Sequence, residues 1–235
     1  MTENRTVKPQ GRPKGLRMDA RTRWRSTSPL RLLTVLVILC GAAPGVARGA
    51  DSPAAVVQQT ADAVVGVLAE KNLTVEQKRA KVQDIVYAHF DFNTLARLVL
   101  ARNWKQLSPE QQKEFVEEFK KHLWMTYGKD VESYNNEHAV VSGDRGEPGG
   151  DWTVKTKILR PGAADILVDY RLRKEDRGWE VIDVIIEGVS LVANFRSQFQ
   201  EIVSNDGPQK LIERLREKNA NGEPLNASGP PVARP

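Results

Sequence analysis

The spacing of apolar residues changes once along the chain, near residue 139, and this change limits the fold more than any other feature. Before it, apolar side chains recur every fourth residue behind Ser108, which is typical of an amphipathic helix. After it, apolar and polar residues alternate over 152–158 and 166–173, which indicates half-buried strands. The helical stripe consists of Phe115, Phe119, Leu123 and Tyr127. The two periods together predict an α+β fold, with helices first and an antiparallel sheet after them.

Helix start signals support the helical half. Thr74 and Ser108 are each followed three residues later by a glutamine, which fits a capping box. Asp91 is suited to cap a shorter helix that follows it. The helix that begins after Ser108 is predicted to run to about Tyr134. Further helices are expected after the sheet, over 191–204 and 208–218.

Three turns divide the second half into four strands with connections of hairpin length. The turns lie at 146–150, 160–162 and 176–178. The last strand, over 179–191, carries apolar residues on both faces, so we expect it to be buried on both sides and central in the sheet. Gly188 is expected to end this strand with a bend or a close approach of the backbone.

Residues 1–50 are typical of a signal peptide. A basic segment is followed by a short apolar run over 30–40 and then by small residues. The apolar run is too short to span a membrane, so cleavage that leaves a first residue between Arg48 and Asp51 is expected to release a soluble chain. A second start at Met18 would leave a leader of ordinary length.

The single cysteine, Cys40, lies inside this leader. A lipid anchor on Cys40 is the alternative to cleavage, but Leu39 before it is bulkier than the small residue that lipoprotein processing prefers. The mature chain is therefore expected to contain no thiol, which removes disulfides and cysteine nucleophiles from consideration.

The segment after the leader is expected to form one domain over 51–219, followed by a disordered tail over 220–235 that is rich in glycine, proline and asparagine. The leader holds ten of the 35 basic residues and two of the 30 acidic ones, which leaves 25 basic and 28 acidic residues in the remainder. A domain of slightly negative charge lacks the basic surface that binds phosphate backbones, so we exclude nucleic acid as a partner.

No residue pattern supports catalysis. Ser190 stands in a sequence that begins like a nucleophile elbow, but the second glycine and a later histidine are missing. Asp183 and Glu187 would lie about 13 Å apart on a strand, too far for paired glycosidase carboxylates. Glu118 and His122 are the one metal-like pair, and we interpret them as a surface contact across one helical turn. We therefore expect no enzyme, no metal and no cofactor.

Two segments resemble a known family. Glu-Gly-Val-Ser-Leu at 187–191, after a tryptophan-bearing strand, is the more specific, and the other runs from Phe90 to Trp104. Both are similar to the MlaC family, also called the toluene-tolerance family, and order and spacing agree from about Val56 to Lys218. Ala101 stands where glycine is expected and Phe195 where tyrosine is common, but neither difference removes a charged group.

The resemblance implies a curved antiparallel four-stranded sheet wrapped by N- and C-terminal helices, with an apolar pocket between sheet and helices. It implies a monomeric periplasmic carrier that buries the acyl chains of a phospholipid. The carrier would exchange its lipid with an inner-membrane MCE-domain ABC transporter complex and with an outer-membrane lipoprotein complex. Two alternatives stay open: a hopanoid-associated lipid carrier of the same family, and a non-catalytic envelope assembly factor with a solid core.

We place the pocket between the helical stripe and the apolar faces of the strands, because a cleft in an α+β domain forms naturally between a helix and a sheet. Which face of the last strand meets the lipid is left open. The expected wall residues are Phe92, Leu98, Trp104, Phe115, Phe119, Leu123, Tyr127, Val154, Val168, Tyr170, Val181, Val184, Ile186 and Val189.

Overall fold

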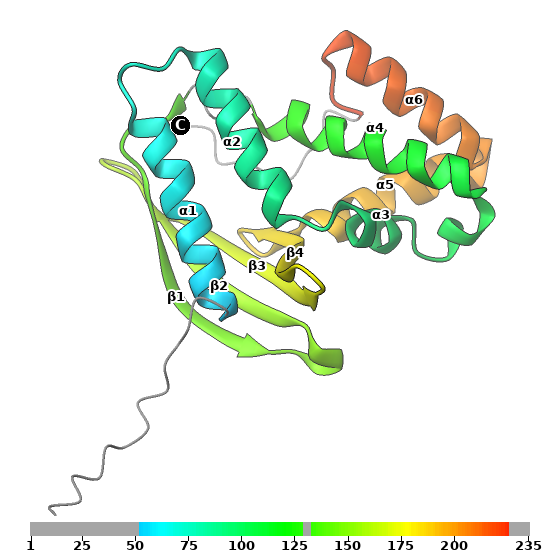
Figure 1. The fold of residues 1–235 in the computed structure, drawn as a ribbon. Coiled ribbons are helices and arrows are strands. Elements are labelled where there is room, and N and C mark those ends of the chain that lie inside the picture. Colours follow the sequence, from blue (N-terminus) through cyan, green and yellow to red (C-terminus); the bar gives the residue numbers. More distant parts are fainter. Residues whose placement is uncertain (1–51, 129–132, 226–235) are drawn as a thin grey trace, which may run out of the picture. The chain divides into compact units, whose positions relative to one another are not determined.

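The computed structural model describes residues 52–128 and 133–225, and the predicted signal peptide lies outside these residues. The described part of the chain contains helices on both sides of the sheet in sequence, which confirms the α+β class (Figure 1). The helices are α1 (Pro53–Ala69), α2 (Val75–His89), α3 (Phe92–Leu100), α4 (Pro109–Tyr127), α5 (Leu191–Asp206) and α6 (Pro208–Asn221). The strands are β1 (His138–Gly146), β2 (Trp152–Leu159), β3 (Ile166–Glu175), β4 (Gly178–Ile186) and β5 (Val189–Ser190).

The predicted helix caps are present. Both capping boxes form, at the start of α2 with Thr74 and at the start of α4 with Ser108. Asp91 accepts a hydrogen bond of 2.9 Å from the Thr94 backbone N–H and caps α3. Helix α6 continues to Asn221, so the segment that the sequence assigned to the tail begins as helix.

Helix α4 ends earlier than the sequence predicted. It stops at Tyr127 and is capped by Gly128, whereas the pattern predicted a helix to about Tyr134. Glycine is a poor helix former, and here the Trp124 ring covers it so closely that a Cβ on Gly128 would lie 2.8 Å from a ring carbon. The apolar spacing gave no sign of this end, because the pattern of apolar residues takes no account of the glycine that follows Tyr127.

The sheet is an antiparallel meander of five strands in the order β1-β2-β3-β4-β5, so the prediction of four strands was one short. The additional strand is the two-residue β5, which pairs with the end of β4. Glu187 and Gly188 form the turn between them, with φ of 49° and 80°. Positive φ at both central residues is the mark of a tight hairpin turn, so the bend expected at Gly188 reverses the chain completely.

Strand β4 is not central, as we had expected, because β3 occupies the middle of the sheet. The apolar residues on both predicted faces of β4 are explained by a β-bulge. The register shifts between Arg171 and Leu172, which leaves Ile182 as an extra residue between the pairs Arg171–Asp183 and Leu172–Val181. Such a bulge shifts the side-chain alternation by one residue, so Val181 and Val184 share one face of the sheet in spite of their odd spacing.

The far edge of β4 is covered rather than exposed. Phe90 forms a parallel bridge with Val181, and the Asp91 backbone N–H donates a hydrogen bond of 3.0 Å to the Val181 carbonyl. β5 covers the other end of the same edge. Unpaired backbone groups at a sheet edge invite pairing with other chains, and this arrangement satisfies them within the domain.

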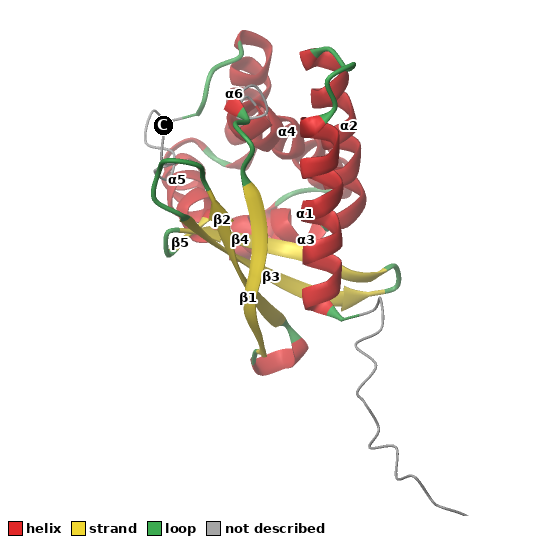
Figure 2. Ribbon diagram, turned by 90° about the vertical axis from the view of Figure 1, so that its left-hand side faces the viewer, coloured by secondary structure: helices red, strands yellow, loops and turns green. Residues whose placement is uncertain are grey.

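The helices form two groups around the sheet. α1 lies across β1 and β2 with α2 beside it, whereas α3, α4, α5 and α6 pack mainly against one another (Figures 1 and 2). The second group is held by a cluster of phenylalanines with ring centroids 5.3 to 5.7 Å apart. The cluster consists of Phe115, Phe119, Phe195 and Phe199. All four are buried, so this helical core is tightly filled.

Candidate functional site

Two apolar cavities lie between the helices and the inner face of the sheet. One, of about 290 Å³, is lined mainly by α1 and by strands β1 to β4, and we call it the α1 cavity. The other, of about 400 Å³, is lined by α2, α4, β3 and β4, and we call it the α4 cavity. Both are lined by Leu68, Val86, Phe90 and Tyr170, so the two cavities meet at these four side chains.

The α1 cavity owes its helical wall to a stripe that the sequence analysis did not single out. Val57, Ala61, Val64 and Leu68 follow one another at spacings of four, three and four residues, and all line the cavity. These spacings place them on one face of α1. Ser52 starts the helix by accepting a hydrogen bond of 3.1 Å from the Ala55 backbone N–H. The signal was present in the sequence, but Val56 and Val65, which also line the cavity, and Val67, which does not, obscure the helical spacing.

Aromatic rings form much of the α4 cavity. Tyr87 meets Phe92 edge to face at 5.2 Å between centroids and lies 6.4 Å from the Trp124 ring. The Lys120 ammonium lies 4.1 Å from the centroid of Tyr87. The wall on the sheet side includes Val184 and Ile186. The aromatic and aliphatic side chains together give the cavity an apolar wall, which suits a flexible apolar ligand.

Tyr170 stands at the junction of the two cavities. It lies directly opposite Val154 on β2 and Val184 on β4, in a cross-strand row on the inner face of the sheet. Burial among apolar side chains raises the pKa of Tyr170 to about 12. Its phenol therefore stays neutral at physiological pH and offers a hydroxyl rather than a charge.

Seven of the fourteen predicted wall residues line the cavities. They are Phe92, Leu123, Tyr127, Tyr170, Val181, Val184 and Ile186. Contact of these seven with a lipid stays a prediction. The lining residues of β4, which are Val181, Val184 and Ile186, all lie on one face of the sheet because of the bulge at Ile182. This is the face of the last long strand that is turned toward the cavities.

The structure places the other seven away from the cavity walls. Phe115 and Phe119 are fully buried in the helical core, where Leu98 and Trp104 pack at its margin. The remaining three are Val154 and Val168, which are buried on the inner face of the sheet without lining either cavity, and the exposed Val189 in β5. The helical stripe on α4 therefore has two parts. Its first two residues, Phe115 and Phe119, pack against α5, and its last two, Leu123 and Tyr127, line the α4 cavity.

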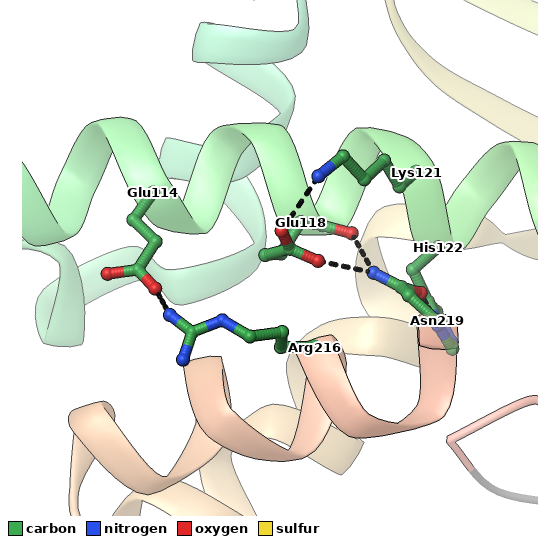
Figure 3. Close-up of polar contacts among 6 residues, drawn as sticks. All are labelled: Glu114, Glu118, Lys121, His122, Arg216 and Asn219. Atoms are coloured by element: carbon green, nitrogen blue, oxygen red, sulfur yellow. Dashed lines mark hydrogen bonds and ion pairs between the residues drawn. The ribbon is translucent and has the colours of Figure 1, made fainter. Parts of the chain in front are cut away.

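The pair Glu118 and His122 is not the surface contact that we expected, because these residues are only 9% and 1% exposed. Asn219 of α6 lies between them (Figure 3). Its amide nitrogen donates to the Glu118 carboxylate at 2.8 Å and to the Glu118 carbonyl at 2.9 Å, and its Oδ1 lies 3.0 Å from His122 Nδ1. Glu114 and Arg216 add an ion pair between the same two helices. These contacts tie α4 to α6. The described residues contain no group of three side chains suited to a metal ion.

Ser190 and Asp183 also have structural roles. The Ser190 hydroxyl donates to Asp183 Oδ2 at 2.6 Å and accepts from the Ala193 backbone N–H at 3.0 Å, as the N-cap of α5. The other oxygen of Asp183 accepts from the Val192 backbone N–H at 3.0 Å. Both groups are thus occupied in holding the start of α5 against β4.

None of the helices in the described part of the chain is long and apolar enough to cross a membrane. The model of the MlaC protein family matches residues 58–217. Toluene tolerance protein ttg2D of Pseudomonas putida is 26% identical over 177 residues, which cover 73% of this chain and 82% of that protein. The intermembrane phospholipid transport system binding protein MlaC of Haemophilus influenzae is 21% identical over 174 residues, which cover 71% of this chain and 81% of that protein.

Among solved structures, a phospholipid-binding protein from Ralstonia solanacearum, determined in complex with a phospholipid, has the same fold. The TM-score is 0.65 at 26% sequence identity, over 72% of this chain and 97% of that one.

Proposed function

The chain belongs to the MlaC family, and we propose that it is a phospholipid carrier whose two cavities each take one acyl chain. The observation that carries this proposal is the pair of apolar cavities that meet at Tyr170 and Phe90. A diacyl lipid has the same form, with two apolar branches and one junction. The cavity volumes, about 290 and 400 Å³, fall near the range usual for small-molecule sites, about 300 to 1,000 Å³.

The energy of lipid transfer explains why such cavities are needed. Each methylene that enters water costs about 0.8 kcal/mol, so a lipid with roughly fifteen methylenes in each chain meets a barrier above about 20 kcal/mol if it crosses water uncovered. A carrier lowers this barrier by covering both chains while the headgroup stays hydrated. The apolar walls of the two cavities supply that cover without any reactive group.

We propose further that the carrier works in the periplasm, after export directed by residues 1–50. There it would exchange lipid with an inner-membrane MCE-domain ABC transporter complex on one side and an outer-membrane lipoprotein complex on the other. We propose no catalytic step. Ser190, Asp183, Glu118 and His122, the groups that came closest to an active site in the sequence, are held in structural hydrogen bonds.

The two alternatives make different demands on the cavities. A hopanoid is a single rigid fused-ring body, which would fill one cavity and leave its neighbour without a ligand. An assembly factor with a solid core would need neither cavity. Two cavities that meet at a shared wall favour two flexible chains of one lipid.

Native mass spectrometry of protein purified from the periplasm tests the proposal. We expect the polypeptide mass plus the mass of a diacyl phospholipid, and a mature start between Arg48 and Asp51. A bare polypeptide that takes up no phospholipid from vesicles would refute lipid carriage. Recovery of the protein in the membrane fraction with an acylated Cys40 would refute the soluble, cleaved form.

A further inference from the structure

Lys120 carries the only formal charge among the described residues that line the α4 cavity. Its ammonium lies 4.1 Å from the centroid of Tyr87 and 5.5 Å from that of Phe92. Within the described residues it forms no ion pair, in contrast to the next residue, Lys121, which is bound to Glu118 at 2.9 Å. The half-buried Lys120 ammonium is thus held beside the cavity by aromatic rings, and its positive charge can pair with an anion.

The charges that surround the two cavities differ in sign. Glu137 is the only carboxylate among the described residues that line the α1 cavity, and it repels an anion there. On its own helix, Glu118 lies two residues before Lys120 but is bound to Lys121 and Asn219, and Glu117 lies three residues before it and is exposed. A ligand with an anionic group and two apolar chains is therefore favoured in one orientation, with its anionic end at Lys120.

We propose that Lys120 binds the phosphate of the lipid headgroup at the rim of the α4 cavity. This inference rests on the proposed function and adds to it a specificity residue, which selects diacyl lipids that bear a phosphate over neutral diacyl lipids. One chain enters the α4 cavity directly, and the other passes Phe90 and Tyr170 into the α1 cavity.

The position of Lys120 suits this role physically. Its aliphatic stem can lie on apolar surface while its ammonium stays at the boundary with water. A charged hydrogen bond at such a boundary is stronger than one in bulk water, because the apolar wall lowers the local dielectric constant. The Tyr87 and Phe92 rings restrict the ammonium before the lipid arrives, which reduces the ordering that binding requires.

A competition experiment tests the proposal. The full mature protein is incubated with vesicles that contain equal amounts of phosphatidylglycerol and of diacylglycerol with identical acyl chains, and the bound lipids are measured by mass spectrometry. We expect the unmodified protein to favour phosphatidylglycerol by about tenfold, the effect of one charged hydrogen bond. Lys120→Glu and Lys120→Gln are expected to lose this preference and still bind diacylglycerol. Lys120→Arg is expected to retain it.

Lys113→Glu is the matched control, because Lys113 is exposed on the same helix and lines neither cavity. It should keep the tenfold ratio. An unchanged ratio in both Lys120→Glu and Lys120→Gln would overturn the role of Lys120 while lipid carriage stands. Uptake of neither lipid by the unmodified protein would overturn the proposed function itself. If millimolar inorganic phosphate abolished the preference for phosphatidylglycerol, Lys120 would be a binding site for a free anion and not for a lipid headgroup.

Discussion

Asn219 Oδ1 and His122 Nδ1 lie 3.0 Å apart, and this contact defines the protonation of the histidine. The Asn219 amide nitrogen donates to Glu118, so its Oδ1 is the atom that faces the ring and His122 must donate from Nδ1. His122 Nε2 then accepts the Leu225 backbone N–H at 3.3 Å. The network is complete only when His122 is neutral.

Stability is therefore expected to fall in mild acid. Burial lowers the pKa of His122, although its bond to Asn219 opposes this. The unfolded chain, with an ordinary histidine pKa near 6.5, takes up the proton first as pH falls. The contribution of His122 is complete above that pH and is lost as pH decreases toward the folded pKa. Urea unfolding at pH 7.5 and 5.5 measures it.

The same unfolding experiment with His122→Gln should show a smaller loss between the two pH values, whereas the exposed His138→Gln should behave like the unmodified protein. Glu118 does not contribute to the difference between these two pH values. Burial by itself would raise its pKa, but hydrogen bonds from Lys121 and Asn219 together outweigh burial and hold the pKa below the ordinary value. Equal losses in all three proteins would contradict the neutral assignment of His122.

Asn219→Ala is expected to destabilise the domain by about 1 to 3 kcal/mol, because it leaves the buried Glu118 and His122 without their shared partner. Asn221→Ala, on the exposed end of the same helix, should change stability by less than about 0.5 kcal/mol. Chemical denaturation at pH 7.5 gives both values. A similar small effect of the two substitutions would show that the network contributes little to stability.

Ala101 has a φ of 48° and a ψ of −121°, a conformation that costs a residue with a Cβ about 1 kcal/mol or more. This is the position where the family resemblance predicted glycine, so the structure gives the physical reason for that glycine. Ala101→Gly should therefore stabilise the protein by about 1 kcal/mol. Ala88→Gly, at an exposed helical position in α2, should destabilise it by about the same amount. Destabilisation by both would contradict the strain at Ala101.

Gly188→Val should lower the melting temperature and the amount of bound lipid together. Gly188 has a φ of 80°, and the turn that it forms follows Val184 and Ile186, which line the α4 cavity. Gly143→Val is the control that separates backbone strain from side-chain size. A Cβ at Gly143 or at Gly188 meets no atom within 4 Å, but of the two only Gly188 has a positive φ. If the two valine variants melted at the same temperature, the conformation of Gly188 would not be what matters.

Features that depend on a few neighbouring residues could be predicted from the sequence. The caps at Thr74, Asp91 and Ser108 and the first three strands follow from local hydrogen bonds and from alternation, and the structure has them as expected. Features that depend on contacts between distant residues could not. The burial of His122 depends on Asn219, 97 residues later. The shared face of Val181 and Val184 depends on a bulge against β3.

The cavities show the same limit. Periodicity marks an apolar face but does not show whether another element fills the space in front of it. Phe119 and Leu123 belong to one stripe on α4, yet Phe119 packs against three other phenylalanines and Leu123 lines a cavity. The difference arises because Phe195 and Phe199 of α5 fill the space in front of Phe119.

The most direct test places a carboxylate on the cavity wall and in the helical core and compares the two variants. Val86, half-buried on α2, lines both cavities, whereas Phe119 has no exposed surface. Thermal unfolding and co-purified phospholipid are measured on the same samples. Val86→Glu should stay folded and lose its lipid, because an open cavity can hydrate the charge, and Phe119→Glu should unfold. A folded Val86→Glu protein that keeps its lipid, or one that unfolds like Phe119→Glu, would contradict a lipid-binding cavity between the helices and the sheet.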